Sequence, residues 1–164
     1  MNVMRDIGAF LKAATARAIE TITAGAGNDN VAVNGPWIDL SAMKERPHSA
    51  KIIFFGAATL AATETLKLIL AKLQDATDGS GTGAADISGE ALAGVPITLA
   101  TGPGGGGTVN FIQSYDIVNL AQARQAVRLV STVDLSRANT DTTTVAALMV
   151  LGGFDKVPPS GTGS

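Results

Sequence analysis

The chain has 164 residues, of which 46% are hydrophobic, only 4% aromatic and 16% charged, and its formal net charge is −2. This length suits one domain with a sizeable core, and the low charge disfavours nucleic acid and anionic membranes as partners. The sequence lacks cysteine and has one histidine, His48, which excludes disulfides, thiolate sites and multi-histidine metal sites. We therefore expect no metal and no other cofactor. No membrane span is expected either, because uninterrupted apolar runs stay shorter than the roughly 20 residues that a spanning helix needs.

The beginning of the chain differs in pattern from the rest. Apolar residues recur at helical spacing from Ile7 to Ala18, and Asp6 stands where a capping residue would be. The stripe is only moderately apolar, so an extended arm that packs on another surface is a second interpretation. We assign residues 1–18 to an N-terminal arm or short helix.

The period then changes to that of β-structure. Residues 20–24 and 31–33 alternate around a Gly/Asn/Asp cluster, which predicts a hairpin. The run from Ile52 to Phe55 is almost continuously apolar, which is typical of a central strand covered on both faces. Residues 75–94 are mostly small and polar, and predict a long surface loop. Further strands are predicted over residues 37–40, 49–57, 65–73, 95–101, 108–120, 126–135 and 142–151.

About eight short strands separated by turn signals indicate an all-β fold, an antiparallel, jelly-roll-like β-sandwich. The sandwich domain is expected over residues 19–153, followed by a Gly/Pro/Ser tail over residues 154–164. The segment 65–73 mixes Leu with Lys and is compatible with a helix. We interpret it as a strand because Thr63 and Thr65 lower helix propensity.

The motifs that could carry chemistry fail on their context. Gly102, Gly104 and Gly107 satisfy G-x-G-x-x-G, but a β-branched segment follows where a dinucleotide site needs a helix. The aspartates and glycines of residues 75–86 do not have the spacing of an EF-hand loop. His48 has no identifiable nucleophile or orienting acid. We therefore predict no catalytic, cofactor-binding or metal-binding residue, and a protein that is not an enzyme.

Interaction sites are the remaining candidates. The densest charge in the chain surrounds His48, and a polar contact with a neighbouring subunit is its most natural function. The only tryptophan lies between a turn and a strand, and chain ends with large apolar residues usually need a partner that covers them. The interface candidates are Phe10, Leu11, Trp37, Lys44, Arg46, His48, Phe154 and Val157.

The succession of segments from Pro36 to Phe154 resembles small structural proteins of tailed-bacteriophage virions. The resemblance is carried by GPWIDL, SAKIIFFGAA, a Leu/Lys strand ending in QDATDGSGTG, RQAVRLVSTVDLS and TDTTTVAALMVLGGF. It implies a capsid decoration (cement) protein, made in the host cytoplasm, that sits on the outer capsid surface and bridges neighbouring major capsid protein subunits. It also implies a homo-oligomer, with a trimer favoured.

Three other functions stay open. The first is a structural role at the head-to-tail junction or in the tail. The second, from a different class, is a carbohydrate-binding or adhesive β-sandwich, which needs exposed aromatic side chains. An enzyme is the weakest alternative, because no nucleophile and base pair is identifiable.

Overall fold

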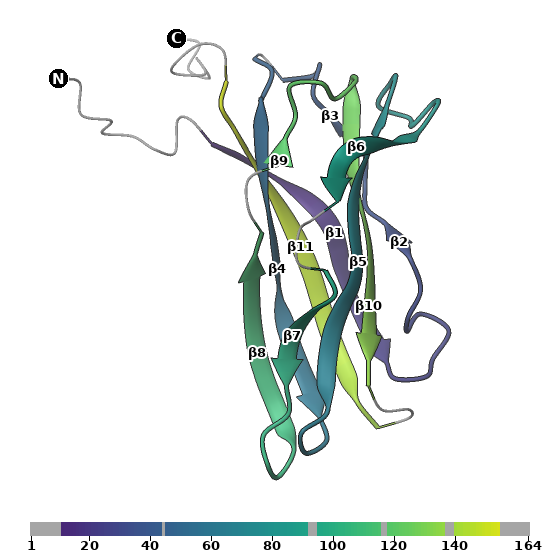
Figure 1. Ribbon diagram of the computed structural model, residues 1–164, viewed down its shortest axis with the longest axis vertical. Helices are drawn as coiled ribbons and strands as arrows, with labels where there is room; N and C mark the ends of the chain where they lie inside the picture. The colour runs from purple at the N-terminus through teal and green to yellow at the C-terminus, as the bar shows by residue number, and fades with distance from the viewer. Residues whose placement is uncertain (1–10, 44, 92–94, 116–117, 137–139, 155–164) are drawn as a thin grey trace, which may run out of the picture.

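The computed structural model describes residues 11–43, 45–91, 95–115, 118–136 and 140–154. These residues form an all-β structure whose strands run along the long axis of the molecule (Figure 1). In chain order the strands are β1 (Lys12–Thr23), β2 (Val33–Asn34), β3 (Ile38–Asp39), β4 (Ser49–Leu60), β5 (Thr65–Ala76), β6 (Ala85–Ala91), β7 (Ile97–Thr101), β8 (Gly107–Ser114), β9 (Val118–Asn119), β10 (Ala126–Leu135) and β11 (Thr142–Gly152).

The strands form two antiparallel sheets. Sheet A has the order β1-β11-β4-β8, with β9 also paired to β4, and sheet B has the order β2-β10-β5-β6, with β3 on β10 and β7 on β5. The first strand thus pairs with the last, and the chain passes repeatedly from one sheet to the other, which is jelly-roll connectivity. The predicted β-sandwich is confirmed, and eight of its strands have five or more residues.

The core lies between the two sheets and is built from aliphatic side chains of both. Ile52 and Phe54 of β4 and Leu66, Leu68 and Leu73 of β5 are fully buried. Phe54 meets Tyr115 edge to face, with ring centroids 5.9 Å apart. Burial raises the pKa of Tyr115 to about 12, and its hydroxyl has no hydrogen-bond partner among the described residues. Apolar packing, rather than hydrogen bonding, therefore holds the side chain of Tyr115 in the core.

The helix expected over residues 7–18 is wrong where it can be checked. Residues 12–18 belong to β1, which pairs with β11 from Lys12 opposite Leu151 onward, and residues 7–10 lie outside the described part of the chain. Two register shifts interrupt this pairing, between Thr15 and Arg17 and between Arg17 and Glu20. Because bulges break the two-residue period of a strand, Ala14 and Ala18 of β1 fall at an interval that resembles a helix.

The hairpin expected from residues 20–33 is also wrong. β1 pairs with β11 in sheet A, whereas β2 pairs with β10 in sheet B. The turn between them carries the chain from one sheet to the other. Asp29 fixes this turn by accepting hydrogen bonds from the backbone N–H groups of Gly25 and Leu135. The expected long loop over residues 75–94 is likewise interrupted by β6.

Candidate functional site

The outer face of sheet A is nearly free of charge. The register of its four long strands places one lysine, Lys51, among apolar residues, threonines and other neutral side chains. The other outward residues are Ala13, Thr15, Ala18, Ile19, Thr21 and Thr23 of β1, Ile53, Phe55, Ala57 and Thr59 of β4, Thr108, Asn110, Ile112 and Ser114 of β8, and Thr142, Thr144, Ala146, Leu148 and Val150 of β11. The solvent face of an antiparallel sheet is normally polar, so this composition marks a candidate interaction surface.

An apolar row crosses the whole width of this face. Ile112 of β8 lies opposite Phe55 of β4, which lies opposite Ala146 of β11. The bulge residues Ala18 and Ile19 of β1 fall opposite Ala146, between the pairs Arg17 with Ala147 and Glu20 with Val145. Ile112 and Ile19 are each 75% exposed, the largest values among the exposed large hydrophobic residues. The row thus ends in an exposed isoleucine at each edge of the sheet.

Threonines occupy one end of the same face. Thr108, Thr59, Thr142 and Thr23 form a row across all four strands. The hydroxyls of Thr59 and Thr108 are hydrogen-bonded at 2.8 Å, and those of Thr21 and Thr144 at 3.2 Å. Because these four hydroxyls pair across strands, part of their hydrogen-bonding capacity is satisfied within the sheet.

An open hollow of about 200 Å³ lies at the opposite end. It is lined by Leu11, residues 49–51, Val150 and Gly152. Leu11 is 48% exposed at its rim. This part of the face is where β1 begins, and Lys51 supplies its charge.

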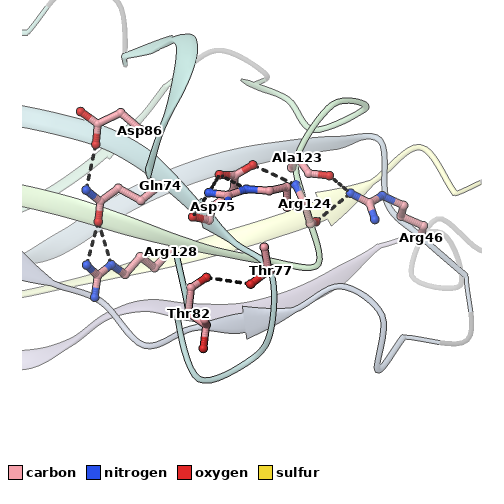
Figure 2. A network of polar contacts seen from close by, with 9 residues as sticks. All are labelled: Arg46, Gln74, Asp75, Thr77, Thr82, Asp86, Ala123, Arg124 and Arg128. Carbon is pink, nitrogen blue, oxygen red and sulfur yellow. Dashed lines mark hydrogen bonds and ion pairs between the residues drawn. The ribbon is translucent and has the colours of Figure 1, made fainter. Parts of the chain in front are cut away.

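The outer face of sheet B has the opposite character. Its outward residues include Lys67, Lys72, Arg128 and Asp134, and Asp86 of β6 adds a further charge. Arg128 donates to Oε1 of Gln74, whose amide donates to Asp86 (Figure 2). The outer face of sheet B is therefore the more charged of the two, although Val130 and Thr132 on it are buried.

A second polar cluster joins the end of β5 to the loop between β9 and β10. Arg124 donates to both carboxylate oxygens of Asp75 through its backbone N–H and its guanidinium, and to the backbone carbonyl of Asp75 (Figure 2). Burial would raise the pKa of Asp75, but the hydrogen bonds from Arg124 outweigh it and hold this pKa below its usual value. The shift comes from an ion pair that joins the end of β5 to the loop between β9 and β10.

Two of the predicted interface residues, Arg46 and His48, form hydrogen bonds within their own chain near this cluster. Arg46 donates to the backbone carbonyls of Ala123 and Arg124 (Figure 2). The backbone of His48 bonds to Gly152 and Leu120. The Arg46 guanidinium thus bridges two loops of its own chain, while Lys44 lies outside the described residues.

Trp37 is a packed side chain. It is half-buried, the guanidinium of Arg128 lies 4.5 Å from its ring centroid, and the loop at Gly81 lies against its indole nitrogen. Phe154 is also half-buried and packs against the core. Of the terminal candidates, Leu11 is exposed, and Phe10 and Val157 lie outside the described part of the chain. The structure therefore does not gather the predicted interface residues into one surface.

Sequence reasoning missed the residues that make up the apolar row. The continuous run from Ile52 to Phe55 predicted a strand covered on both faces, yet Ile53 and Phe55 are only half-buried on the outer face of sheet A. A signal was present on β8. Ile112 stands between Asn110 and Ser114 on the polar side of an alternating strand, where a large apolar residue is unexpected.

Among the described residues, no three His, Asp or Glu side chains lie close enough to hold a metal ion. The same part of the chain holds no helix of the length and apolarity that crossing a membrane requires.

Comparisons with known proteins give a likeness in fold. No protein-family model and no curated protein matches the chain. Its structure is similar to the VP2 subviral particle of infectious bursal disease virus, with a TM-score of 0.50 and 12% identity over 92% of this chain and 34% of the viral chain. A structure of the Gx strain of the same virus has a TM-score of 0.48, also at 12% identity, over 92% of this chain and 33% of the viral one. The chain thus spans about a third of the length of these viral chains, and what the two proteins share at this identity is the β-sandwich fold.

Proposed function

We propose that this chain is a non-enzymatic structural protein of a virus particle. The single observation that carries the proposal is the charge-poor outer face of sheet A, with an apolar row that ends in exposed Ile112 and Ile19. Such a face costs solubility in an isolated protein and is explained when a neighbouring subunit covers it. The jelly-roll fold is used by many capsid proteins and is shared with the VP2 subviral particle, which adds an argument by analogy of fold.

The finer form of the proposal is a capsid decoration protein of a tailed bacteriophage. In this role the chain sits on the outer surface of the shell, bridges major capsid protein subunits, and is made in the host cytoplasm. Its mechanism is mass action: a protein that binds the assembled shell and not the free subunits stabilises the shell, by about 2.7 kcal/mol per site when its concentration is 100 times Kd. A structural role at the head-to-tail junction or in the tail is the neighbouring alternative.

A carbohydrate-binding function has less support. Sugar binding by a β-sandwich needs exposed aromatic faces for stacking. Within the described residues, Phe54, Phe111 and Tyr115 are buried and the other aromatic side chains are at most half-exposed. Trp37 is additionally covered by Arg128 and the loop at Gly81.

The copy number of the chain in purified virus particles tests the function. Quantitative mass spectrometry should find it at a fixed ratio to the major shell protein. A copy number near that of the shell protein supports decoration. A copy number as small as that of a single ring of subunits supports the junction or tail. Particles that contain none of the chain contradict the proposal.

The terminal candidates are tested with a chain that keeps β1 whole. Deleting residues 1–10 should weaken binding to particles that lack the protein, while the melting temperature of the isolated chain stays within a few degrees. The expectation rests on the exposure of Leu11, at the point where these residues join the sheet. Binding equal to that of the full chain would remove Phe10 from the interface.

A further inference from the structure

We propose that the outer face of sheet A binds the same face of a second copy of this chain, through a two-fold symmetric contact. This inference rests on the proposed function, because it names the subunit that covers the face. The resemblance to decoration proteins favours a trimer, whereas the features of this face favour pairs. Three properties of the described residues carry the argument: charge, the symmetry of the apolar row, and the paired threonine hydroxyls.

The scarcity of charge on the outer face of sheet A favours a partner surface that is also poor in charge. The outer face of sheet A carries Lys51 at one end and neutral side chains elsewhere. A strongly charged partner would be desolvated against it without compensation. The outer face of sheet B, with Lys67, Lys72, Arg128 and Asp134, is unsuited for that reason. A second sheet A face is charge-poor, so two copies of net charge −2 meet with only their two Lys51 side chains as like charges, and an axis across the strands places these at opposite ends of the contact.

The apolar row is complementary to itself. Ile112 and Ile19 lie at its two ends, with Phe55 and Ala146 between them. A two-fold axis that runs across the strands places Ile112 over Ile112 of the second copy. An axis that runs along the strands places Ile112 over the second copy's Ile19. Both arrangements bring isoleucine onto isoleucine at each edge, as a self-complementary contact requires.

The threonines lower the cost of burying the rest of the face. Hydroxyls become expensive on leaving water when they lack partners. Thr59 bonds to Thr108, and Thr21 bonds to Thr144, across neighbouring strands. Their methyl groups are then left to contact the second copy.

The first test measures the mass of the full chain in solution by sedimentation velocity over a range of concentrations. We expect a concentration-dependent dimer. The variants Ile112→Asp and Ile19→Asp should each raise its Kd by at least about 100-fold, since a symmetric contact loses the substituted side chain twice and buries the new charge twice. Val31→Asp is the matched control, because Val31 is 45% exposed but precedes β2 of sheet B. Its Kd should equal that of the parent chain.

A milder variant separates interface loss from misfolding. Ile112→Thr keeps a β-branched residue on the edge strand and removes apolar contact. It should leave the circular dichroism spectrum and melting temperature of the monomer unchanged while weakening the dimer by about 10-fold. Weakening seen only in variants with altered spectra would overturn the proposal.

Cysteine substitution then identifies the axis, because the chain has no cysteine of its own. With a bis-maleimide cross-linker that spans about 10 Å, the usual separation of packed sheets, Ile112→Cys alone should form a covalent dimer if the axis runs across the strands. A mixture of Ile112→Cys and Ile19→Cys should form the mixed dimer if the axis runs along them. Val31→Cys should stay monomeric, and failure of both sheet A combinations would overturn the proposal.

The outcomes also separate this inference from the proposed function. A chain that is monomeric or trimeric in solution, or a dimer insensitive to Ile112→Asp and Ile19→Asp, overturns the pairing even if the chain is found in virus particles. A dimer with the expected sensitivities, absent from purified particles, upholds the pairing and contradicts the virion function.

Discussion

Arg17 of β1 and Ser131 of β10 join the two sheets through a buried contact. The guanidinium Nη1 donates to the carbonyl of Ser131 at 3.1 Å and to its hydroxyl at 2.9 Å. Nη2 forms an ion pair with Glu20 at 2.9 Å. Burial lowers the pKa of Arg17, and the interactions with Glu20 oppose this shift. The contact closes one edge of the sandwich, where β1 approaches β10.

Replacing this arginine should therefore weaken the whole domain. We expect Arg17→Ala to lower the free energy of unfolding by about 3 kcal/mol, because it leaves a cavity and removes the buried hydrogen bonds to the carbonyl and hydroxyl of Ser131. Arg17→Met fills most of the volume and should cost less. Urea unfolding of both variants measures the difference, and equal losses would show that the hydrogen bonds to Ser131 matter more than packing.

Gly81 is expected to tolerate no side chain. Its φ is +90°, and an added Cβ would lie 2.2 Å from Nε1 of Trp37. Gly81→Ala should lower the free energy of unfolding by about 2 kcal/mol and change the emission of the only tryptophan. Gly104→Ala is the control, since a Cβ there meets nothing within 4 Å. Tryptophan emission unchanged by Gly81→Ala would mean that the loop moves away at low cost.

The ion pair of Asp75 with Arg124 should make stability fall in acid. The pKa of Asp75 is lower in the folded chain than in the unfolded one, so its contribution is complete above the unfolded value of about 3.9 and is lost as the pH falls through the folded value. Asp75→Asn should be less stable than the parent chain at pH 7. Urea titrations from pH 7 to 3 should show the two curves converging below about pH 4. A gap that stays constant with pH would exclude the carboxylate charge as its cause.

Ionisation of Asp134 should lower the stability of the folded chain, the opposite of the effect at Asp75. Burial and the nearby charge of Asp29 raise its pKa, with Lys67 acting against them. A raised pKa in the folded state means that ionisation costs stability, and this cost is absent below the unfolded value and complete above the folded one. Asp134→Asn should therefore be more stable than the parent chain at pH 7, by up to about 0.5 kcal/mol, and equal to it near pH 3. Thermal melts at the two pH values test this, and a less stable variant at pH 7 would be the contrary result.

The sequence predicted the fold class well because strand alternation is a local signal. Leu66 and Leu68 alternate with Thr65 and Lys67 at the start of residues 65–73, and this segment forms most of β5. The errors lie where pairing is not local. Up to residue 18 the sequence pattern predicts an arm or a short helix, because the bulges of β1 disturb the alternation and the partner strand, β11, lies more than 100 residues away.

The candidate surface was harder to predict for a related reason. Nothing in the segment around Ile53 and Phe55 tells whether its second face is covered by another layer or by a partner. The order of strands in the sheet determines which face of this strand is covered. That order depends on long-range pairs, such as Phe55 with Ile112, that the sequence does not reveal. For Arg46 the charge predicted contact with a neighbouring subunit, whereas its partners are backbone carbonyls of its own chain.

The position of β11 has a consequence for how the chain folds during synthesis. β11 is the last strand in chain order, yet it lies between β1 and β4 in the middle of sheet A. Until it emerges from the ribosome, β1 has no partner in its sheet, and the row from Ile112 to Ile19 remains in two separate pieces. Domains complete such long-range pairings late. The complete apolar face is thus assembled only after β11 has left the ribosome and inserted between β1 and β4.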